Sequence, residues 1–191
     1  MKGLTLGVAL LCGAFAIPAN ANEYAAQLGE LAKSRISAIA QSPDIIAAIK
    51  AQNAETASYD QAKIDSLDKD WRAQVGAASQ PLIDGVIGRD ASKHLAQERE
   101  ASAGLMTEIF VMDARGLNVA QSDVTSDYWQ GDEAKWQDTF SKGPGAVHIS
   151  EVEEDESTQT FQSQVSMSVT DPADGSVIGA ITVGVNVEML N

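Results

Sequence analysis

The chain has 191 residues, a formal net charge of −14 at pH 7 and a sequence pI of about 4.3. A chain of this length can form one domain that buries ~70% of its unfolded surface. Its negative charge repels DNA, RNA and anionic membrane surfaces, so we expect no nucleic-acid partner. The same charge favours solubility and cationic ligands or partners.

The first residues have the order of a secretory signal peptide. One positive charge at Lys2 precedes an apolar run from Leu4 to Ile17, which ends in the small-x-small sequence Ala19-Asn20-Ala21. The apolar run is shorter than the ~20 residues that a membrane-spanning helix needs. We therefore expect residues 1–21 to be a signal peptide, cleaved after Ala21. The mature chain, 22–191, is then periplasmic or secreted, with no membrane insertion.

Residues typical of catalytic sites are scarce in this predicted mature chain. The single cysteine, Cys12, lies in the signal peptide, so the fold must also hold without disulfides. The only histidines, His94 and His148, lie in different halves without metal-ligand spacing. No serine stands in a G-x-S-x-G turn. We therefore predict that the protein is not an enzyme and needs no cofactor.

The first half of the mature chain, residues 22–105, is predicted to be helical because apolar residues recur at spacings of three and four. Ser42-Pro43-Asp44 has the order of a helix start, with a cap, a proline in the first turn and an acid near the positive end. Asp90 is predicted to cap a further helix that runs to about Ala103. The apolar residues that carry the pattern are Leu28, Leu31, Ile36, Ile39, Ile45, Ile46, Ile49, Ile64, Leu67, Trp71 and Val75.

The second half, residues 106–191, changes to the alternation of strands. In the fourth strand Val165 and Val169 share one face, while Gln162 and Gln164 lie on the other. Helices followed by strands with tight connections predict an α+β fold with a five-stranded antiparallel sheet, in one domain overall. The predicted strands are 107–113, 117–122, 146–153, 160–169 and 177–187, with a short helix from about Asp132 to Phe140 before Gly143-Pro144-Gly145.

Aromatic and charged residues are concentrated between the second and third strands, in DVTSDYWQGDEAKWQDTF (123–140). Aromatic faces attract cations, acids pair with an ammonium group, and a lysine pairs with a carboxylate, so an amino acid or amine would suit this segment. An alternative is structural: Trp136 and Phe140 can form the core face of the short helix, with Asp132 as its cap. The candidate ligand-binding residues are Tyr128, Trp129, Asp132, Glu133, Lys135 and Trp136.

The acidic loops leave a cation site open as an alternative. Asp123, Thr125 and Asp127 alternate as the first ligands of a calcium loop do. An EF-hand would then need Gly where Tyr128 stands and Glu where Ala134 stands, so this is not an EF-hand. The acidic tip at 151–156 is typical of a solvated turn, although it could also meet a basic partner.

Three stretches together resemble the Cache family, the extracytoplasmic PAS-like sensor domains of chemoreceptors and sensor kinases, in its single-module form. They read I-F-V-M-D-A-R-G-L-N-V-A-Q-S, D-Y-W-Q-G-D-E-A-K-W and S-V-T-D-P-A-D-G-S-V-I-G-A-I-T-V-G-V-N-V, and follow a long N-terminal helix. The resemblance implies a small-molecule sensor whose ligand lies between the sheet and the 123–140 segment. Such domains are usually flanked by membrane helices and an output domain, which we expect this chain to lack.

The leading hypothesis is therefore an exported domain that binds a small organic ligand and signals through a membrane receptor or another signalling partner. One alternative is a protein-interaction module that forms a homodimer or docks through its N-terminal helix without any ligand. A weaker alternative is a divalent-cation-binding protein that uses the acidic loops.

Overall fold

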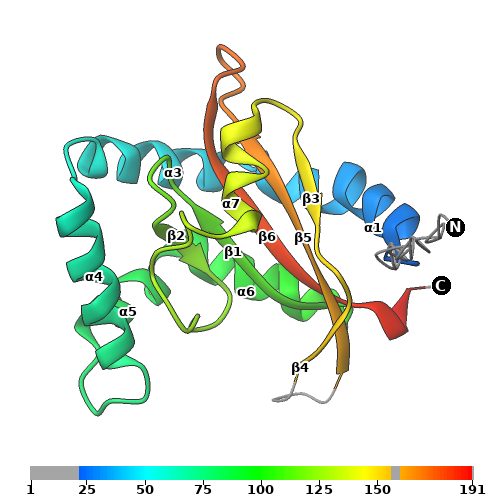
Figure 1. The fold of residues 1–191 in the computed structure, drawn as a ribbon, viewed down its shortest axis with the longest axis horizontal. Coiled ribbons are helices and arrows are strands. Elements are labelled where there is room, and N and C mark those ends of the chain that lie inside the picture. Colours follow the sequence, from blue (N-terminus) through cyan, green and yellow to red (C-terminus); the bar gives the residue numbers. More distant parts are fainter. Residues whose placement is uncertain (1–21, 156–159, 191) are drawn as a thin grey trace, which may run out of the picture.

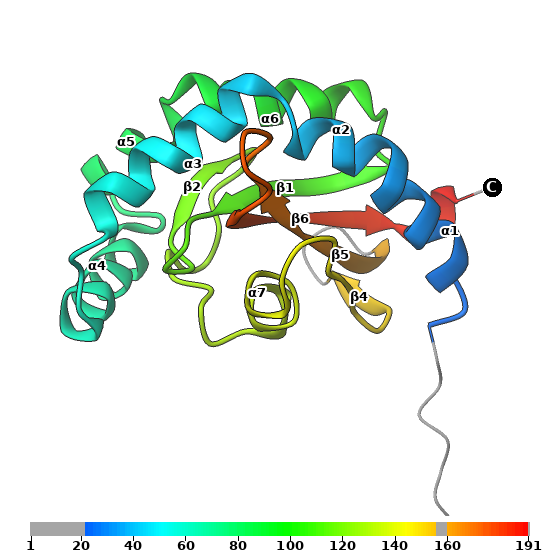
Figure 2. The ribbon, with the colours of Figure 1, turned by 90° about the horizontal axis from the view of Figure 1, so that it is seen from above.

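The computed structural model describes residues 22–155 and 160–190, so the predicted signal peptide lies outside the described residues. Helices cover one face of an antiparallel sheet, and a shorter helical segment lies on the opposite face (Figure 1, Figure 2). The predicted fold class, α+β with an antiparallel sheet, is confirmed. Within the described part of the chain, no helix has the length and apolarity to cross a bilayer.

The helices of the first half mostly follow the predicted pattern. Ser42 stands at the N-cap position before Pro43, but its hydroxyl donates to the Ile39 carbonyl and makes no capping bond. Arg89, and not Asp90, is the N-cap residue of the sixth helix. The fifth helix was not predicted, because seven residues are too few to show a helical period. The helices are α1 Ala25–Leu31, a π-helical turn Ala32–Ile36, α2 Ser37–Ala40, α3 Pro43–Thr56, α4 Gln61–Gln74, α5 Pro81–Ile87 and α6 Asp90–Ala101.

The sheet has the order β2-β1-β6-β5-β3, with β4 also paired to β5, and all pairings are antiparallel. β3 and β4 lie one after the other along the same edge of β5 (Figure 1). The strands are β1 Met106–Met112, β2 Asn118–Gln121, β3 Val147–Ile149, β4 Glu153–Asp155, β5 Thr160–Thr170 and β6 Val177–Asn186.

The prediction of one continuous strand over 146–153 is wrong, because the ladder is interrupted at Ser150. There the Ser150 hydroxyl accepts the hydrogen bond of the Gln164 backbone N–H, at 2.9 Å. The Ser150 carbonyl accepts instead from the Asn22 side chain at 2.7 Å and from the Ser163 hydroxyl at 2.8 Å. The hydroxyl thus replaces the Ser150 carbonyl as an acceptor, while the Ser150 backbone N–H still donates to the Gln164 carbonyl at 2.9 Å. Backbone pairing with β5 resumes at Glu153 in β4.

The main core lies between the sheet and the layer formed by α1, α2, α3 and α6 (Figure 2). The alternation predicted for β5 is confirmed, since Val165 and Val169 are fully buried in this core. Each fully buried Leu, Ile or Val contributes about 1.5–3 kcal/mol relative to an exposed one. The other large side chains buried there include Leu28, Ile36, Ile45, Ile49, Leu95, Met106, Ile109, Ile181 and Val183.

The helix predicted from Asp132 to Phe140 is shorter and divided. It consists of α7, Ala134–Gln137, and a 3-10 turn, Phe140–Lys142. The buried Thr139 separates them, because its hydroxyl donates to the Lys135 carbonyl at 2.6 Å and competes with the helical bonds. Glu133, and not Asp132, is the N-cap residue of α7, and it makes no capping bond.

The expectation that Trp136 and Phe140 pack together is confirmed. Their rings stack with centroids 4.8 Å apart and pack on a small cluster of Phe110, Met112 and Ala180. This cluster lies on the sheet face opposite the main core, and Trp136 attaches α7 to that face (Figure 2).

Candidate functional site

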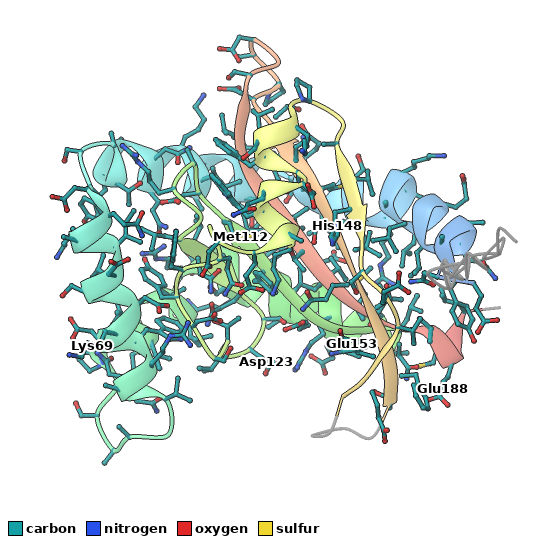
Figure 3. All side chains as sticks on the ribbon, viewed as in Figure 1. Lys69, Met112, Asp123, His148, Glu153 and Glu188 are labelled. Carbon is teal, nitrogen blue, oxygen red and sulfur yellow. The ribbon has the colours of Figure 1, made fainter. Side chains whose placement is uncertain are left out.

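A pocket of about 320 Å³ lies where α7 passes over the β3–β5 side of the sheet. Figure 3 shows His148 and Glu153 on the two strands that form this edge, with α7 beside them. The volume is within the range of ~300–1,000 Å³ that small-molecule pockets occupy. The lining residues are Glu133, Ala134 and Lys135 from the α7 segment, His148, Ser150 and Glu153 from the edge, and Gln162 and Gln164 from β5.

The two glutamines are held in place by β1, two strands away. The Thr107 hydroxyl donates to Gln162 Oε1 at 2.7 Å, and Gln164 Nε2 donates to Glu108 Oε1 at 2.8 Å. These bonds cross the intervening strand at Gly184, where an added Cβ would collide with Thr107 and Glu108. The absence of a side chain at this glycine therefore allows β1 and β5 to form a continuous polar floor.

Lys135 is the cation of the pocket, and its side chain is only 15% exposed. Its Nζ lies 2.9 Å from Glu133 Oε2 and 5.5 Å from the centroid of the Phe110 ring. A lysine so largely removed from water is stabilised by anionic and aromatic partners. A ligand carboxylate that entered the pocket could make a charge-assisted hydrogen bond with this ammonium group.

His148 connects the edge strand to the α7 segment. Its Nδ1 lies 3.8 Å from Asp138 Oδ2, directly after α7, and Asp138 Oδ1 lies 3.6 Å from Lys142 Nζ. The ring nitrogens of His148 can donate or accept a hydrogen bond at the pocket wall.

The structure places the six candidate residues in four locations. Glu133 and Lys135 line the pocket. Trp136 lies beside it, where its Nε1 donates to the Asp113 carbonyl at 3.2 Å and holds α7 to the end of β1. Asp132 is exposed and is not among the lining residues.

Tyr128 and Trp129 belong to a separate cluster beneath α4 and α5. Tyr128 is 5% exposed and stacks on Trp71 with centroids 5.2 Å apart, and this burial raises the pKa of Tyr128 to about 12. Trp129 Nε1 donates to the Arg115 carbonyl at 2.8 Å. Other members of the cluster are Ile64, Ile83, Val86 and Leu117.

The alternating acids that left a cation site open as an alternative pair with arginines. Asp123 pairs with Arg99, and Asp127 Oδ2 accepts from Arg72 Nη2 at 3.2 Å. In 22–155 and 160–190, no group of three or more His, Cys, Asp and Glu residues is placed to hold a metal ion.

Comparisons with known proteins concern the fold alone. No protein-family model and no curated protein matches the sequence. Among solved structures, the sensor domain of the Vibrio cholerae histidine kinase DctB is 15% identical, with a TM-score of 0.40, 86% of this chain covered and 57% of that one. The ligand-binding domain of the Campylobacter jejuni chemoreceptor Tlp3 in complex with L-valine is 13% identical, with a TM-score of 0.40 and coverages of 86% and 64%.

A third structure is the ligand-binding domain of the Pseudomonas aeruginosa PAO1 amino acid chemoreceptor PctC in complex with GABA. It is 15% identical, with a TM-score of 0.42, 87% of this chain covered and 61% of that one. This chain spans less than two thirds of each of these three structures.

Sequence reasoning missed most of the lining of this pocket. His148, Ser150, Glu153, Gln162 and Gln164 were not among the candidates. The sequence did contain a signal for the glutamines, because apolar and polar side chains alternate along β5. Its polar face therefore had to face either solvent or the inserted 123–140 segment. No comparable signal existed for Ser150, since its position depends on the interruption between β3 and β4.

Proposed function

We propose that this protein is an exported sensor domain that binds a small polar ligand, an amino acid or an amine, in the pocket beneath α7. The observation that carries the proposal is the position of Lys135, largely buried beside Glu133 and opposite the amide groups of Gln162 and Gln164. Charges of both signs and neutral amides thus meet in a volume suited to a molecule of this size.

The charges of the pocket argue for a ligand that carries an ammonium group and a carboxylate. Lys135 would pair with the carboxylate, and Glu133 or Glu153 would pair with the ammonium. The remaining polar groups would orient the ligand through hydrogen bonds. Of the candidates from the sequence, Glu133 and Lys135 would touch the ligand and Trp136 would keep α7 in place. Tyr128, Trp129 and Asp132 would act through the segment that leads into α7.

Export follows from the signal peptide proposed for residues 1–21, and signalling would require a partner that recognises the ligand-bound state. Binding would fix α7 against the polar floor of the sheet, because the ligand would contact both. A receptor or kinase could then distinguish the bound from the free domain through the position of this segment.

The test is a thermal-shift screen of the purified protein against amino acids, amines, carboxylates and divalent cations, followed by calorimetry with the best compound. A ligand at 100-fold over its dissociation constant adds ~2.7 kcal/mol, enough to raise Tm by several degrees. We expect Lys135→Met to weaken binding by about tenfold or more, since an ion pair is lost. Lys142→Met, at an exposed lysine of the same segment, should bind normally. Equal affinity of both variants would refute the assignment of this pocket.

A second candidate function is docking of another protein on the N-terminal helix. The outer side of α1 forms a shallow groove lined by Ala26, Leu31 and Leu190, among others. Light scattering would test the homodimeric form of this function. A monomer at all accessible concentrations would eliminate it.

A further inference from the structure

Three buried side-chain amides lie together where β2 meets the loop that follows it. Asn118, Gln121 and Gln130 are 0%, 1% and 1% exposed. Each has one amide atom without a hydrogen-bond partner in the described part of the chain: Asn118 Oδ1, Gln121 Nε2 and Gln130 Oε1. Such an atom costs about 1–3 kcal/mol when left unpaired, and in native proteins it usually has an ion or ordered water as its partner.

The three amides surround the same two atoms, Thr125 Oγ1 and the Asp127 carbonyl oxygen. Asn118 Nδ2 donates to both, at 2.9 and 3.1 Å. Gln130 Nε2 donates to the Asp127 carbonyl at 3.3 Å and to its carboxylate at 3.0 Å. Because the Asp127 oxygens can only accept, the NH₂ groups of both amides must face them. Their oxygens therefore face away, toward the unpaired positions.

The orientation of the Gln121 amide follows from the position of the Thr125 hydroxyl proton. The Thr125 hydroxyl lies 2.6 Å from the Asp127 carbonyl, a distance that requires its proton there. It cannot also donate to Gln121 Oε1 at 3.3 Å. With the amide turned over, Nε2 donates to Thr125 Oγ1 and Oε1 takes the buried unpaired position. With this assignment the three unpaired amide atoms are all oxygens: Asn118 Oδ1, Gln121 Oε1 and Gln130 Oε1.

We propose that Asn118 Oδ1, Gln121 Oε1 and Gln130 Oε1 bind a small monovalent cation: Na⁺, K⁺ or NH₄⁺. A cation in contact with all three oxygens would satisfy them together, whereas one water molecule has only two hydrogens to donate. Neutral oxygen ligands suit a monovalent ion, since Ca²⁺ sites in proteins use several carboxylates.

The charges nearby favour a cation at this position. Asp68 and Asp127 both pair with Arg72, so this group of three carries one net negative charge. None of the three amides is among the residues that line the pocket beneath α7. The inference is therefore independent of the proposed function. A bound cation would fix the loop between β2 and α7 through Asn118, Gln121 and Gln130.

The experiment measures Tm of the purified protein at constant ionic strength, with choline chloride replaced in turn by NaCl, KCl or NH₄Cl. At 100-fold over its dissociation constant, the preferred ion should raise Tm by roughly 5–10 °C over choline. Gln121→Met removes one oxygen with little change in shape and should abolish the difference between salts. Gln97→Met, at an exposed glutamine of α6, should preserve it.

A second measurement keeps the test decisive if Gln121→Met folds poorly. Crystals of the unaltered protein grown in RbCl should show an anomalous peak in contact with the three amide oxygens. The proposal is overturned if Tm is the same in all four salts and the crystals show no such peak, which would mean that the site holds ordered water alone.

Discussion

Asp113, at the end of β1, connects the first hairpin to α3. It is fully buried, and its carboxylate accepts from Gln52 Nε2 at 3.1 Å and from the Thr56 hydroxyl at 2.9 Å. It also accepts from the backbone N–H groups of Arg115 and Leu117. A buried carboxylate with four donors is satisfied, and removal of its charge weakens every one of these bonds.

We therefore expect Asp113→Asn to lower the free energy of unfolding by about 2–3 kcal/mol, because an amide can accept at only one of its two positions. Urea denaturation followed by circular dichroism would measure the loss. Asp174→Asn, at an exposed aspartate of the last hairpin turn, should change stability far less. A loss below about 0.5 kcal/mol for Asp113→Asn would contradict the role given to this carboxylate.

Asp171, at the start of the turn between β5 and β6, pairs with Lys50 of α3 at 2.5 Å. The hydrogen bond from Lys50 holds the pKa of Asp171 below its usual value. Because the pKa is lower in the folded state, the pair stabilises the fold above the unfolded pKa of about 3.9, and this contribution is lost as pH falls through the folded value.

Asp171→Asn should accordingly lower Tm at pH 7, and the difference from the unaltered protein should narrow as pH falls from 5 to 3. Asp65→Asn, at an exposed aspartate of α4, serves as the control. A Tm difference that stays constant over this pH range would show that Asp171 acts without its charge.

At the scale of elements, α4 holds the loop that leads into α7. Asp68 Oδ1 accepts from the backbone N–H groups of Tyr128 and Trp129, at 2.9 and 3.0 Å. Trp71 Nε1 donates to the Thr125 carbonyl at 2.9 Å. Figure 1 shows that α4 stands at the far side of the sheet from β3. The 123–140 segment is therefore held by α4 near its start and by the Trp136 cluster near its end.

Asp68→Ala should therefore increase hydrogen exchange in residues 123–131 while β5 and β6 keep their protection. The two amide N–H groups would lose their acceptor, and local opening would become easier. Asp65→Ala, one turn earlier on the same helix, provides the comparison for mass spectrometry. Uniformly faster exchange would indicate a global loss of stability, which argues against a local role for Asp68.

Elements with a regular hydrophobic pattern could be predicted from the sequence. Elements whose bounds depend on a single side-chain hydrogen bond could not. β5 and β6 have long alternating or apolar runs, and their predicted bounds differ from the structure by one residue or less at each end. The division of α7 depends on the Thr139 hydroxyl, and the gap between β3 and β4 depends on the Ser150 hydroxyl. Both are single side-chain bonds that a hydrophobic pattern does not contain.

At the scale of the whole molecule, the pocket combines residues that are distant in sequence. Glu133 and Lys135 were predicted because charged and aromatic residues are dense in their segment. Gln162 and Gln164 reach the same pocket only through the pairing of β5 with β6 and β3, which brings them beneath α7. This part of the site requires the sheet order, and composition along the chain does not specify it.

The two faces of the sheet differ in how they can respond to a ligand. One face is sealed by the main core, whereas in the described part of the chain the other is covered by the α7 segment, which packs on the small Trp136 cluster (Figure 2). A ligand in the pocket should therefore slow hydrogen exchange in residues 131–150, and leave α1, α3 and α6 unchanged. Mass spectrometry with the compound that gives the largest thermal shift would measure this pattern, with Lys135→Met as the control that loses it. Protection centred on α1 instead would place the binding event at the N-terminal groove and support the docking function.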